Sequence, residues 1–594
     1  MRFNFRRFGL IGTLAMVTAL VVTACGGGGD PTAAPGAPQP QAPLPTATPA
    51  PTATLEAAAT VAPNPTQAPQ PQVLPTSTPR PTTGPTVKRG GTLTLPQFHD
   101  LVTFDASNTR LYMGYYLNGH FLWNQVVTFD NKRWSDSDVV GDLATEWSIN
   151  DDGTVWTFKL DPAARWQNIA PLNGRNMTAA DIKWYFEYVL DPDNNSGIGG
   201  IIRDIETIEA PDDNTIVFNL KAPFSGFLRS LANSRVKVLP RENLEANGNF
   251  ETPIGTGPFV HNRHERGARV IHDANPNYWK IGADGQALPY IDRVEFIIGA
   301  DSVTVEAGLR TGKLAFITPG GMDPQVARDF MDDNPQLDWI IDFKLYAPVV
   351  FTNFKVEPWK SNRDLRLAIM RAINQDAIRS NVIFEDGAPL EGPITAGMGE
   401  FSLPQDELKE LLRYDLDEAK ALVISSGVGG DDLKVRLQFM LAGSPGSQTE
   451  RYGLVIPPML EAAGFDVQLN MPASAAQGYG AIYGGNFEIG SGFVGFEGDI
   501  NNWFRSFYSS TGDRNRPGLS DPTLDAMIAE FDATLDHDLQ VTRAHEIQRY
   551  ILEQAYYVPL VAGSMFIPQQ KYVKDFIRTW SWGFSKIEFV WLDL

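Results

Sequence analysis

The pattern of apolar and polar positions divides the 594-residue chain into three stretches. Leu10 to Val22 form a short apolar run behind three arginines. Residues 26–88 hold 16 of the 43 prolines and contain no Phe, Trp or Tyr. From Lys88 onward, aromatic and β-branched residues recur with the spacing of strands and helices. The pattern therefore predicts an export segment, an extended tether and a large folded part.

In the folded part, turn residues separate short alternating runs from longer runs with helical spacing. The expected strands are residues 90–95, 154–160 and 214–220, and the expected helices are residues 178–190, 364–378, 525–534 and 542–555. Thr178 followed by Asp181 resembles a capping box at the start of the first helix. Strands and helices alternate through the second half, which predicts α/β lobes.

The apolar run ends in a short motif of small residues and a cysteine. Val22-Thr-Ala-Cys25 resembles the lipobox of bacterial lipoproteins, in which the cysteine becomes lipidated after cleavage. We therefore predict a signal peptide at 1–24, lipid on Cys25 and a Pro/Thr/Ala-rich disordered tether at 25–88. The alternative is an ordinary signal peptide with an incidental cysteine. No later segment has 18 unbroken apolar residues.

Composition excludes several classes of protein. The single cysteine rules out a disulfide within the chain, and the formal charge of −21 opposes a nucleic-acid binder, which needs a basic face. A Gly-x-Ser-x-Gly nucleophile turn and a phosphate-binding loop are both absent from the sequence. We expect no catalytic residue and no cofactor.

Three histidines, His261, His264 and His272, lie close together in the sequence. Residues three apart in a regular strand point to opposite faces, so His261 and His264 are not expected to share a metal ion. A nickel or zinc site is the less favoured alternative, and we predict no metal.

Motifs spread along the folded part resemble those of the family 5 extracellular solute-binding proteins, the peptide/nickel receptors of ABC importers. The resemblance covers about residues 89–590, and its segments, in chain order, are Gly90-Gly-Thr-Leu, Leu143-Ala-Thr-Glu-Trp, Asp151-Asp-Gly-Thr-Val-Trp, Met177-Thr-Ala-Ala-Asp, Gly255-Thr-Gly-Pro-Phe, Asn275-Pro-Asn-Tyr-Trp, Pro289-Tyr-Ile-Asp-Arg, Asp364-Leu-Arg-Leu-Ala-Ile, Pro522-Thr-Leu-Asp and Tyr557-Val-Pro-Leu.

The resemblance implies a two-lobed α/β periplasmic-binding-protein fold of type II, with a hinge between the lobes and an extra domain inserted in lobe one. By analogy, lobe one is 89–128, 251–344 and 555–594, the inserted domain is 129–250, and lobe two is 345–554. The implied activity is capture of a small solute between the lobes, without catalysis.

The resemblance also implies ligand-binding residues. In the family's peptide receptors an acidic residue of lobe two binds the ligand's α-amine, but Phe496 stands where that residue is expected. Glu497 or Asp499 is the expected substitute, the alternative being that both are solvated loop residues. We also expect ligand contacts from four residues, Asp100 in lobe one and Asn353, Phe354 and Trp503 in lobe two, although Trp503 equally suits the core.

The expected function is a monomeric substrate-binding lipoprotein of an ABC importer, anchored through Cys25 to the outer face of the bacterial cell membrane. Its partners are an oligopeptide or similar solute and the permease–ATPase complex, with no nucleic acid. Nickel chelates, haem, opines and oligosaccharides remain open as solutes. A tethered hydrolase and a surface adhesion module are the rival functions.

Overall fold

The computed structural model describes residues 87–98, 100–108, 113–130, 139–317, 321–344, 346–385, 387–443, 446–495, 499–576 and 586–594. Cys25, residues 26–86 of the expected tether and Glu497 lie outside these ranges. Within them, no helix has both the length and the apolar character needed to cross a membrane.

In the described part of the chain, the strands form three larger sheets and three two-stranded pairs. In chain order they are β1 (Thr92–Gln97), β2 (Val127–Phe129), β3 (Val139–Gly141), β4 (Ala144–Ile149), β5 (Val155–Leu160), β6 (Ile205–Asp212), β7 (Thr215–Leu220), β8 (Phe259–Glu265), β9 (Arg269–Ala274), β10 (Arg293–Ile298), β11 (Leu337–Phe343), β12 (Tyr346–Thr352), β13 (Lys434–Phe439), β14 (Asp466–Asn470), β15 (Ile489–Gly495), β16 (Tyr557–Pro559), β17 (Ser564–Gln570), β18 (Val573–Lys574) and β19 (Trp591–Leu592).

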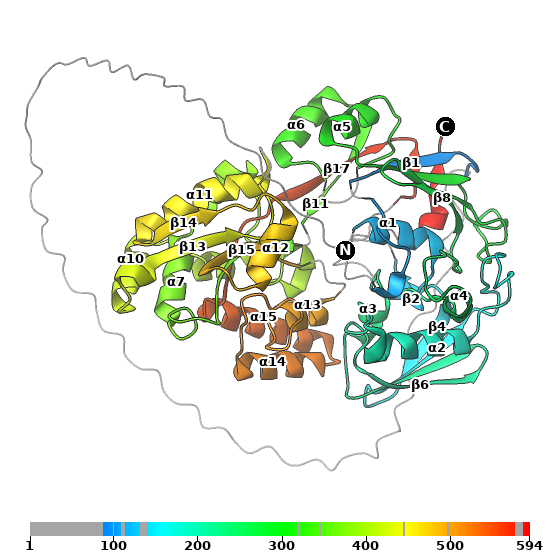
Figure 1. The fold of residues 1–594 in the computed structure, drawn as a ribbon, viewed down its shortest axis with the longest axis horizontal. Helices are drawn as coiled ribbons and strands as arrows, with labels where there is room; N and C mark the ends of the chain where they lie inside the picture. The colour runs from blue at the N-terminus through cyan, green and yellow to red at the C-terminus, as the bar shows by residue number, and fades with distance from the viewer. Residues whose placement is uncertain are drawn as a thin grey trace, which may run out of the picture. The chain divides into compact units, whose positions relative to one another are not determined.

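Helices are interspersed with these strands and are densest in the second half of the chain (Figure 1). They are α1 (Met113–Leu122), α2 (Ala179–Leu190), α3 (Phe227–Leu231), α4 (Arg241–Asn247), α5 (Ser302–Arg310), α6 (Pro324–Asp333), α7 (Arg363–Ala372), α8 (Gln375–Ile378), α9 (Gln405–Leu411), α10 (Leu416–Ser425), α11 (Gln448–Ala463), α12 (Ala475–Tyr483), α13 (Ile500–Phe507), α14 (Pro522–Asp532) and α15 (His537–Glu553).

The first sheet has the order β1-β10-β9-β8 and belongs to lobe one. The expected first strand is confirmed as β1, where Leu93 and Leu95 alternate into the core. β1 pairs in parallel with β10, with Thr92 opposite Arg293. The start of the folded chain is therefore held by a strand that comes much later in the sequence.

The second sheet, β4-β5-β7-β6, is built entirely from the segment between β3 and α3. The expected strands β5 and β7 pair antiparallel, which brings the rings of Phe158 and Phe218 to a centroid distance of 5.7 Å. Helix α2, also expected, covers this sheet with Ile182 and Phe186 buried. This unit has its own aromatic core within the larger one.

The third sheet, β14-β13-β15-β12-β16, forms the centre of lobe two. Its β12 has Val350 in one hydrophobic cluster and Val349 and Phe351 in the other, so both faces of the strand are buried. Helices α7, α10 and α11 contribute to the first of these clusters, and α13, α14 and α15 to the second. The near-continuous apolar run of β12 follows from burial on both faces.

One expected helix is interrupted. Residues 364–378 were expected to be continuous, but α7 ends at Ala372 and α8 begins at Gln375. The side chain of Asn374 accepts hydrogen bonds from the Asp376 and Ala377 N–H groups at 3.1 and 3.0 Å, so it caps a new helix.

The chain passes between the lobes twice in the described residues. One crossover joins β11 to β12, and the other joins β16 to β17. β11 and β17 pair antiparallel, with Leu337 opposite Gln570 and Phe343 opposite Ser564. The two crossovers are therefore adjacent.

A buried ion cluster joins separate stretches of lobe one to the inserted segment. The Lys280 ammonium pairs with Asp142 and lies 3.3 Å from Glu588 Oε1, and Asn124 donates to Asp142 Oδ1 at 2.7 Å. Burial alone would lower the pKa of Lys280, but Asp142, with Tyr278 and Glu588, raises it well above its usual value. The ammonium is thus kept charged by carboxylates from distant parts of the chain.

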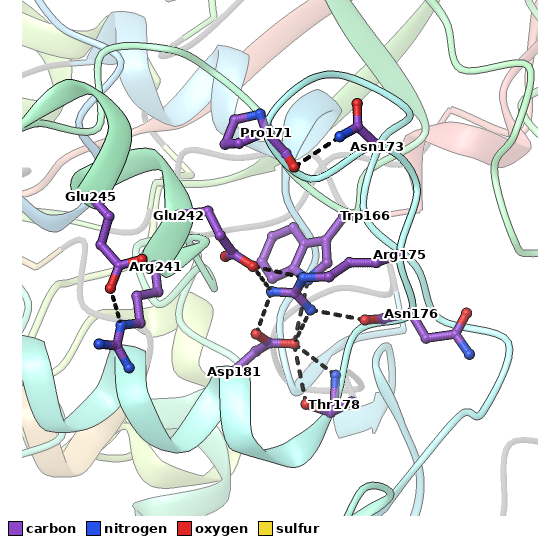
Figure 2. A network of polar contacts seen from close by, with 10 residues as sticks. All are labelled: Trp166, Pro171, Asn173, Arg175, Asn176, Thr178, Asp181, Arg241, Glu242 and Glu245. Carbon is purple, nitrogen blue, oxygen red and sulfur yellow. Dashed lines mark hydrogen bonds and ion pairs between the residues drawn. The ribbon is translucent and has the colours of Figure 1, made fainter.

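A second charged network fixes the start of α2 (Figure 2). The Arg175 guanidinium donates to both carboxylate oxygens of Asp181 at 2.7 and 2.8 Å and to Glu242 Oε1 at 2.7 Å. Asp181 Oδ2 also accepts from the Thr178 N–H at 2.9 Å, which is the backward bond of the expected capping box. The guanidinium carbon is 5.7 Å from the ring centroid of buried Trp166. Arg175 thereby ties its loop to α2 and α4.

We expect Arg175→Met to lower the free energy of unfolding by about 1–3 kcal/mol, because it leaves two part-buried carboxylates without their donor. Chemical denaturation followed by tryptophan fluorescence measures this. The matched control is Arg241→Met, which removes the exposed Arg241–Glu245 pair and the 5.8 Å contact of that guanidinium with the Trp184 ring, and which should change stability by less than about 1 kcal/mol. An equal loss of stability in the two variants would contradict the conclusion that Arg175 ties its loop to α2 and α4.

Candidate functional site

Asp100 lies in the loop after β1 and is bound to β8 and the β8–β9 turn. Its Oδ1 is 2.6 Å from His264 Nε2, and its Oδ2 accepts from the Gly267 N–H at 2.8 Å. Partial burial would raise the pKa of Asp100, but the hydrogen bonds from Gly267, His264 and Leu101 lower it overall. The carboxylate is therefore ionised and occupied by partners of lobe one.

Asn353 and Phe354 follow the end of β12. The Asn353 amide donates to the carbonyls of Gly485 and Phe487 at 3.1 and 3.0 Å, which joins β12 to the turn before β15. The Phe354 ring packs edge-on against Tyr556 at 5.3 Å. Both side chains are buried within lobe two, and a ligand contact from either stays a prediction.

Asp499 and Trp503 both belong to the α13 region. Asp499 is the N-cap of α13, and its carboxylate accepts from the backbone N–H and the side-chain amide of Asn502 at 2.8 and 2.7 Å. Trp503, one turn on, is fully buried. Glu497, the other expected amine-binding residue, lies outside the described residues.

Sequence reasoning missed Arg516, which contacts Phe493 of β15. The Arg516 guanidinium donates to the Phe493 carbonyl at 2.6 Å and lies 5.2 and 5.3 Å from the ring centroids of Phe493 and Phe507. Phe493 also packs edge-on against Tyr346 at 6.0 Å. An arginine and three aromatic rings are therefore grouped at this part of lobe two.

Helix α13 also contacts the segment 204–230, and we call this set the interlobe contact. Arg505 Nη1 donates to Asp204 Oδ2 at 2.6 Å, and its guanidinium carbon is 4.0 Å from the ring centroid of Phe224. The Asn502 amide donates to Ser230 Oγ at 3.1 Å. A Cβ at Gly226 would approach the Asn501 side chain to 2.7 Å, so the two surfaces meet closely there.

The carboxylate of Asp532 strengthens the lobe-two side of the interlobe contact. It pairs with Arg505 and accepts from the Asn501 amide at 2.9 Å, while its backbone carbonyl accepts from the Ser225 N–H at 2.9 Å. Burial would lower the pKa of Arg505, but Asp532 and Asp204 raise it. Sequence reasoning missed this contact because its two sides lie about 300 residues apart.

The three histidines are arranged differently from our expectation. The pairing register shifts between His261 and Arg263, and this β-bulge brings both His261 and His264 next to Phe104, at ring distances of 4.6 and 6.3 Å. The expectation that they point to opposite faces was therefore wrong. Among the described residues, no group of three or more metal-ligating side chains is placed to hold a metal ion.

The buried histidines predict acid sensitivity. Burial, with a smaller contribution from His264, lowers the pKa of His261 to about 4, and burial lowers that of His272 well below its usual value. Between pH 6.5 and about 4 the unfolded chain therefore binds more protons at these sites than the folded chain, so the stability they contribute is full above pH 6.5 and falls as pH falls.

We expect His261→Phe, which keeps a ring against Phe104, to reduce the loss of thermal stability between pH 7 and pH 5. Melting temperatures at the two pH values measure the difference. His537→Gln, at an exposed position on α15, is the control and should leave the pH dependence as it is. If His261→Phe loses as much thermal stability between pH 7 and pH 5 as the wild type, then buried His261 is not a cause of the acid sensitivity.

We expect Asp204→Ala to open the lobes, because it leaves Arg505 without its partner across the interlobe contact. Loss of a part-buried charged hydrogen bond corresponds to about 1.5–3 kcal/mol, and small-angle X-ray scattering should show a larger radius of gyration. Glu206→Ala, on the exposed side of neighbouring β6, should leave the radius unchanged. Identical scattering from both variants would rule out a closing role for the pair.

Comparisons with known proteins agree with this architecture. The family model "Bacterial extracellular solute-binding proteins, family 5 Middle" matches residues 138–515. The chain is 28% identical to di/tripeptide-binding protein 2 of Pseudomonas aeruginosa over 497 residues, which is 80% of this chain and 88% of that protein.

Two solved structures share the fold. One is the periplasmic binding protein DppA of Helicobacter pylori in complex with the peptide STSA, and the other is AgaA of A. tumefaciens R10 in complex with agropinic acid. Each has a TM-score of 0.70 and 22% identity, covering 85% of this chain and 99% of that chain. These neighbours have the two-lobed binding-protein fold. Because the family model matches more than half of the chain, the protein belongs to the bacterial extracellular solute-binding proteins, family 5.

Proposed function

We propose that the protein is the substrate-binding lipoprotein of an ABC importer. It captures a peptide or similar small solute between its lobes and delivers it to the permease, with no bond broken. Its membership of the solute-binding family carries this proposal, because that family match spans residues 138–515. The peptide-binding relative of Pseudomonas aeruginosa supports a peptide as the solute.

The geometry of the lobes supports capture by closure. Two adjacent crossovers join the lobes near β11 and β17, and the interlobe contact joins them again through α13. A solute enclosed between such surfaces loses its water, which strengthens its polar contacts with the protein. Binding energy then adds to the interlobe contact and favours the closed arrangement.

The attachment and the domain borders are part of the same proposal. Lipid on Cys25 and the tether 25–88 hold the receptor at the outer face of the cell membrane. The borders 129–250 and 345–554 are supported by strand pairing, because the sheet β4-β5-β7-β6 lies inside the first range and four of the five strands of the β12 sheet lie inside the second.

We expect a mixture of random tri- to pentapeptides to raise the melting temperature of the protein, because a ligand that binds only the folded state stabilises it. The gain is about 2.7 kcal/mol when the free ligand is 100 times the dissociation constant. Differential scanning fluorimetry gives the shift, and mass spectrometry identifies the retained peptides. A mixture of neutral oligosaccharides is the control, and stabilisation by it alone would replace the peptide assignment.

A further inference from the structure

The second crossover, from β16 to β17, is bonded to helix α11 of lobe two. The Tyr452 hydroxyl of α11 donates to the Val561 carbonyl at 2.6 Å, and the Gln448 amide of the same helix donates to the Ala562 carbonyl at 3.0 Å. Gly563 follows in the left-handed region, at φ 75°, and β17 begins at the next residue. The residues before Gly563 are thus held by lobe two and those after it are paired with β11, so the chain turns between the lobes at this glycine.

Helix α6 belongs to the β17 side of this turning point. The Met322 N–H, just before α6, donates to the Phe566 carbonyl of β17 at 2.7 Å. Phe330 of α6 packs edge-on against Trp339 of β11 at 6.2 Å, and it shares a hydrophobic cluster with Phe566. Helix α6 is therefore fixed to the β11–β17 pair, so any contact that it makes with lobe two spans the hinge.

One such contact is the ion pair of Asp323 with Arg451. Asp323 is the N-cap of α6, where its Oδ1 accepts from the Gln325 N–H at 3.1 Å, and its Oδ2 lies 2.5 Å from Arg451 Nη2. Arg451 belongs to α11, and its guanidinium also donates to the carbonyls of Val382 and Gly446, each at 2.6 Å. The Arg451 side chain is only 12% exposed. A guanidinium held in this way loses less freedom on pairing than one on an open surface, so the pair contributes more than an exposed one.

A second contact joins α6 to residues 384 and 385 of lobe two. The Arg328 guanidinium donates to the Phe384 carbonyl, and its Nη2 lies 4.0 Å from Glu385 Oε1. Glu385 Oε2 accepts from the N–H and the hydroxyl of Ser564, each at 3.0 Å, whereas its Oε1 is buried and accepts no hydrogen bond from the described residues. A carboxylate oxygen in this state favours a close approach of the guanidinium. Helix α6 is thus attracted to lobe two at two points.

The four charged side chains Asp323, Arg328, Glu385 and Arg451 form a set that we call the hinge clasp. Each side of the hinge contributes one cation and one anion, so the attraction depends on how the two sides are placed and does not act in every orientation. The hinge clasp and the interlobe contact are formed by different residues and are present together in the structure. The arrangement of the lobes that satisfies one of them therefore also satisfies the other.

We propose that the hinge clasp stabilises the closed arrangement of the lobes and so sets how often the receptor is closed before a solute arrives. The proposal rests on the function proposed above and names a regulation of it. For a solute that binds only the closed arrangement, the apparent dissociation constant is the intrinsic one divided by the closed fraction. The hinge clasp then adjusts affinity through charged residues at the hinge, while the residues that contact the solute stay the same.

The fraction of closed protein can be measured without a solute by a distance across the lobes. The turn between β4 and β5 meets lobe two, because a Cβ at Gly153 of that turn would lie 2.8 Å from Leu535 Cδ1. Nitroxide labels are placed at exposed positions on the two sides, by Asp151→Cys in the turn and Asp538→Cys on α15. Cys25→Ser removes the only native cysteine of the full chain. Double electron–electron resonance then gives the ratio of short to long distances.

The decisive variant is Asp323→Asn, which removes the charge but keeps a side chain that caps α6. It should lower the ratio of short to long distances about three- to tenfold. Arg328→Gln should lower it as well. Adding Glu385→Gln, which keeps an acceptor for Ser564, to Arg328→Gln should cost less than the sum of the two single changes, because the two groups attract each other in the wild type.

The matched control is Asp301→Asn. Asp301 caps α5 as Asp323 caps α6, with its Oδ1 accepting from the Thr304 N–H at 2.7 Å, and no ion pair joins it to another described residue. This variant should keep the wild-type ratio. A melting curve confirms that each labelled protein is folded.

The outcomes separate the two proposals. If Asp323→Asn keeps the wild-type ratio, or raises the share of short distances, the hinge clasp is overturned while the receptor function stands. The same labelled proteins are then mixed with the random tri- to pentapeptides. If these peptides leave the distances of the wild type unchanged, the peptide-receptor function fails, whereas the ratio without peptide still decides whether the clasp holds the lobes closed.

Discussion

The Lys280 ion cluster is the constraint on which the rest of lobe one depends. The sheet β1-β10-β9-β8 is assembled from strands that lie far apart in the chain, so its surroundings cannot be held by local contacts alone. Lys280 joins Asp142, near the start of the inserted segment, to Glu588, at the end of the chain. Because the three groups are largely shielded from water, removing Lys280 would leave Asp142 and Glu588 without the cation that they share, which is destabilising. The cluster therefore couples these distant stretches of the chain.

Paired charges also join the lobes to each other. Arg505 meets Asp204 across the interlobe contact and Asp532 within its own lobe. When the lobes separate, Asp532 remains with Arg505, so the arginine never loses all its counter-charge. Such an arrangement lets the contact form and break without isolating the guanidinium charge.

Local features of the fold could be predicted from the sequence, and non-local ones could not. Strands β1, β5 and β7 and helix α2 were expected because their apolar periodicity and capping residues act within a few positions. The break at Asn374 was missed because a capping side chain overrode a continuous helical pattern. The bulge after His261 was missed because strand register depends on the partner strand.

In the candidate site, too, some residues could be predicted from the sequence and others could not. Asp499, Trp503, Asn353 and Phe354 were chosen from motif positions, and the structure places all of them in or beside lobe two. The interlobe contact had no such signal, because Asp204 and Arg505 are about 300 residues apart and are brought together only by the fold.

Helix α13 has a consequence for how closure can be controlled. It begins at Ile500, and its residues Asn501, Asn502 and Arg505 make the interlobe contact. Because these residues lie on one short helix, a small change in the placement of that helix would alter every one of their bonds to the segment 204–230 at once. The strength of the interlobe contact therefore depends on a single element of lobe two.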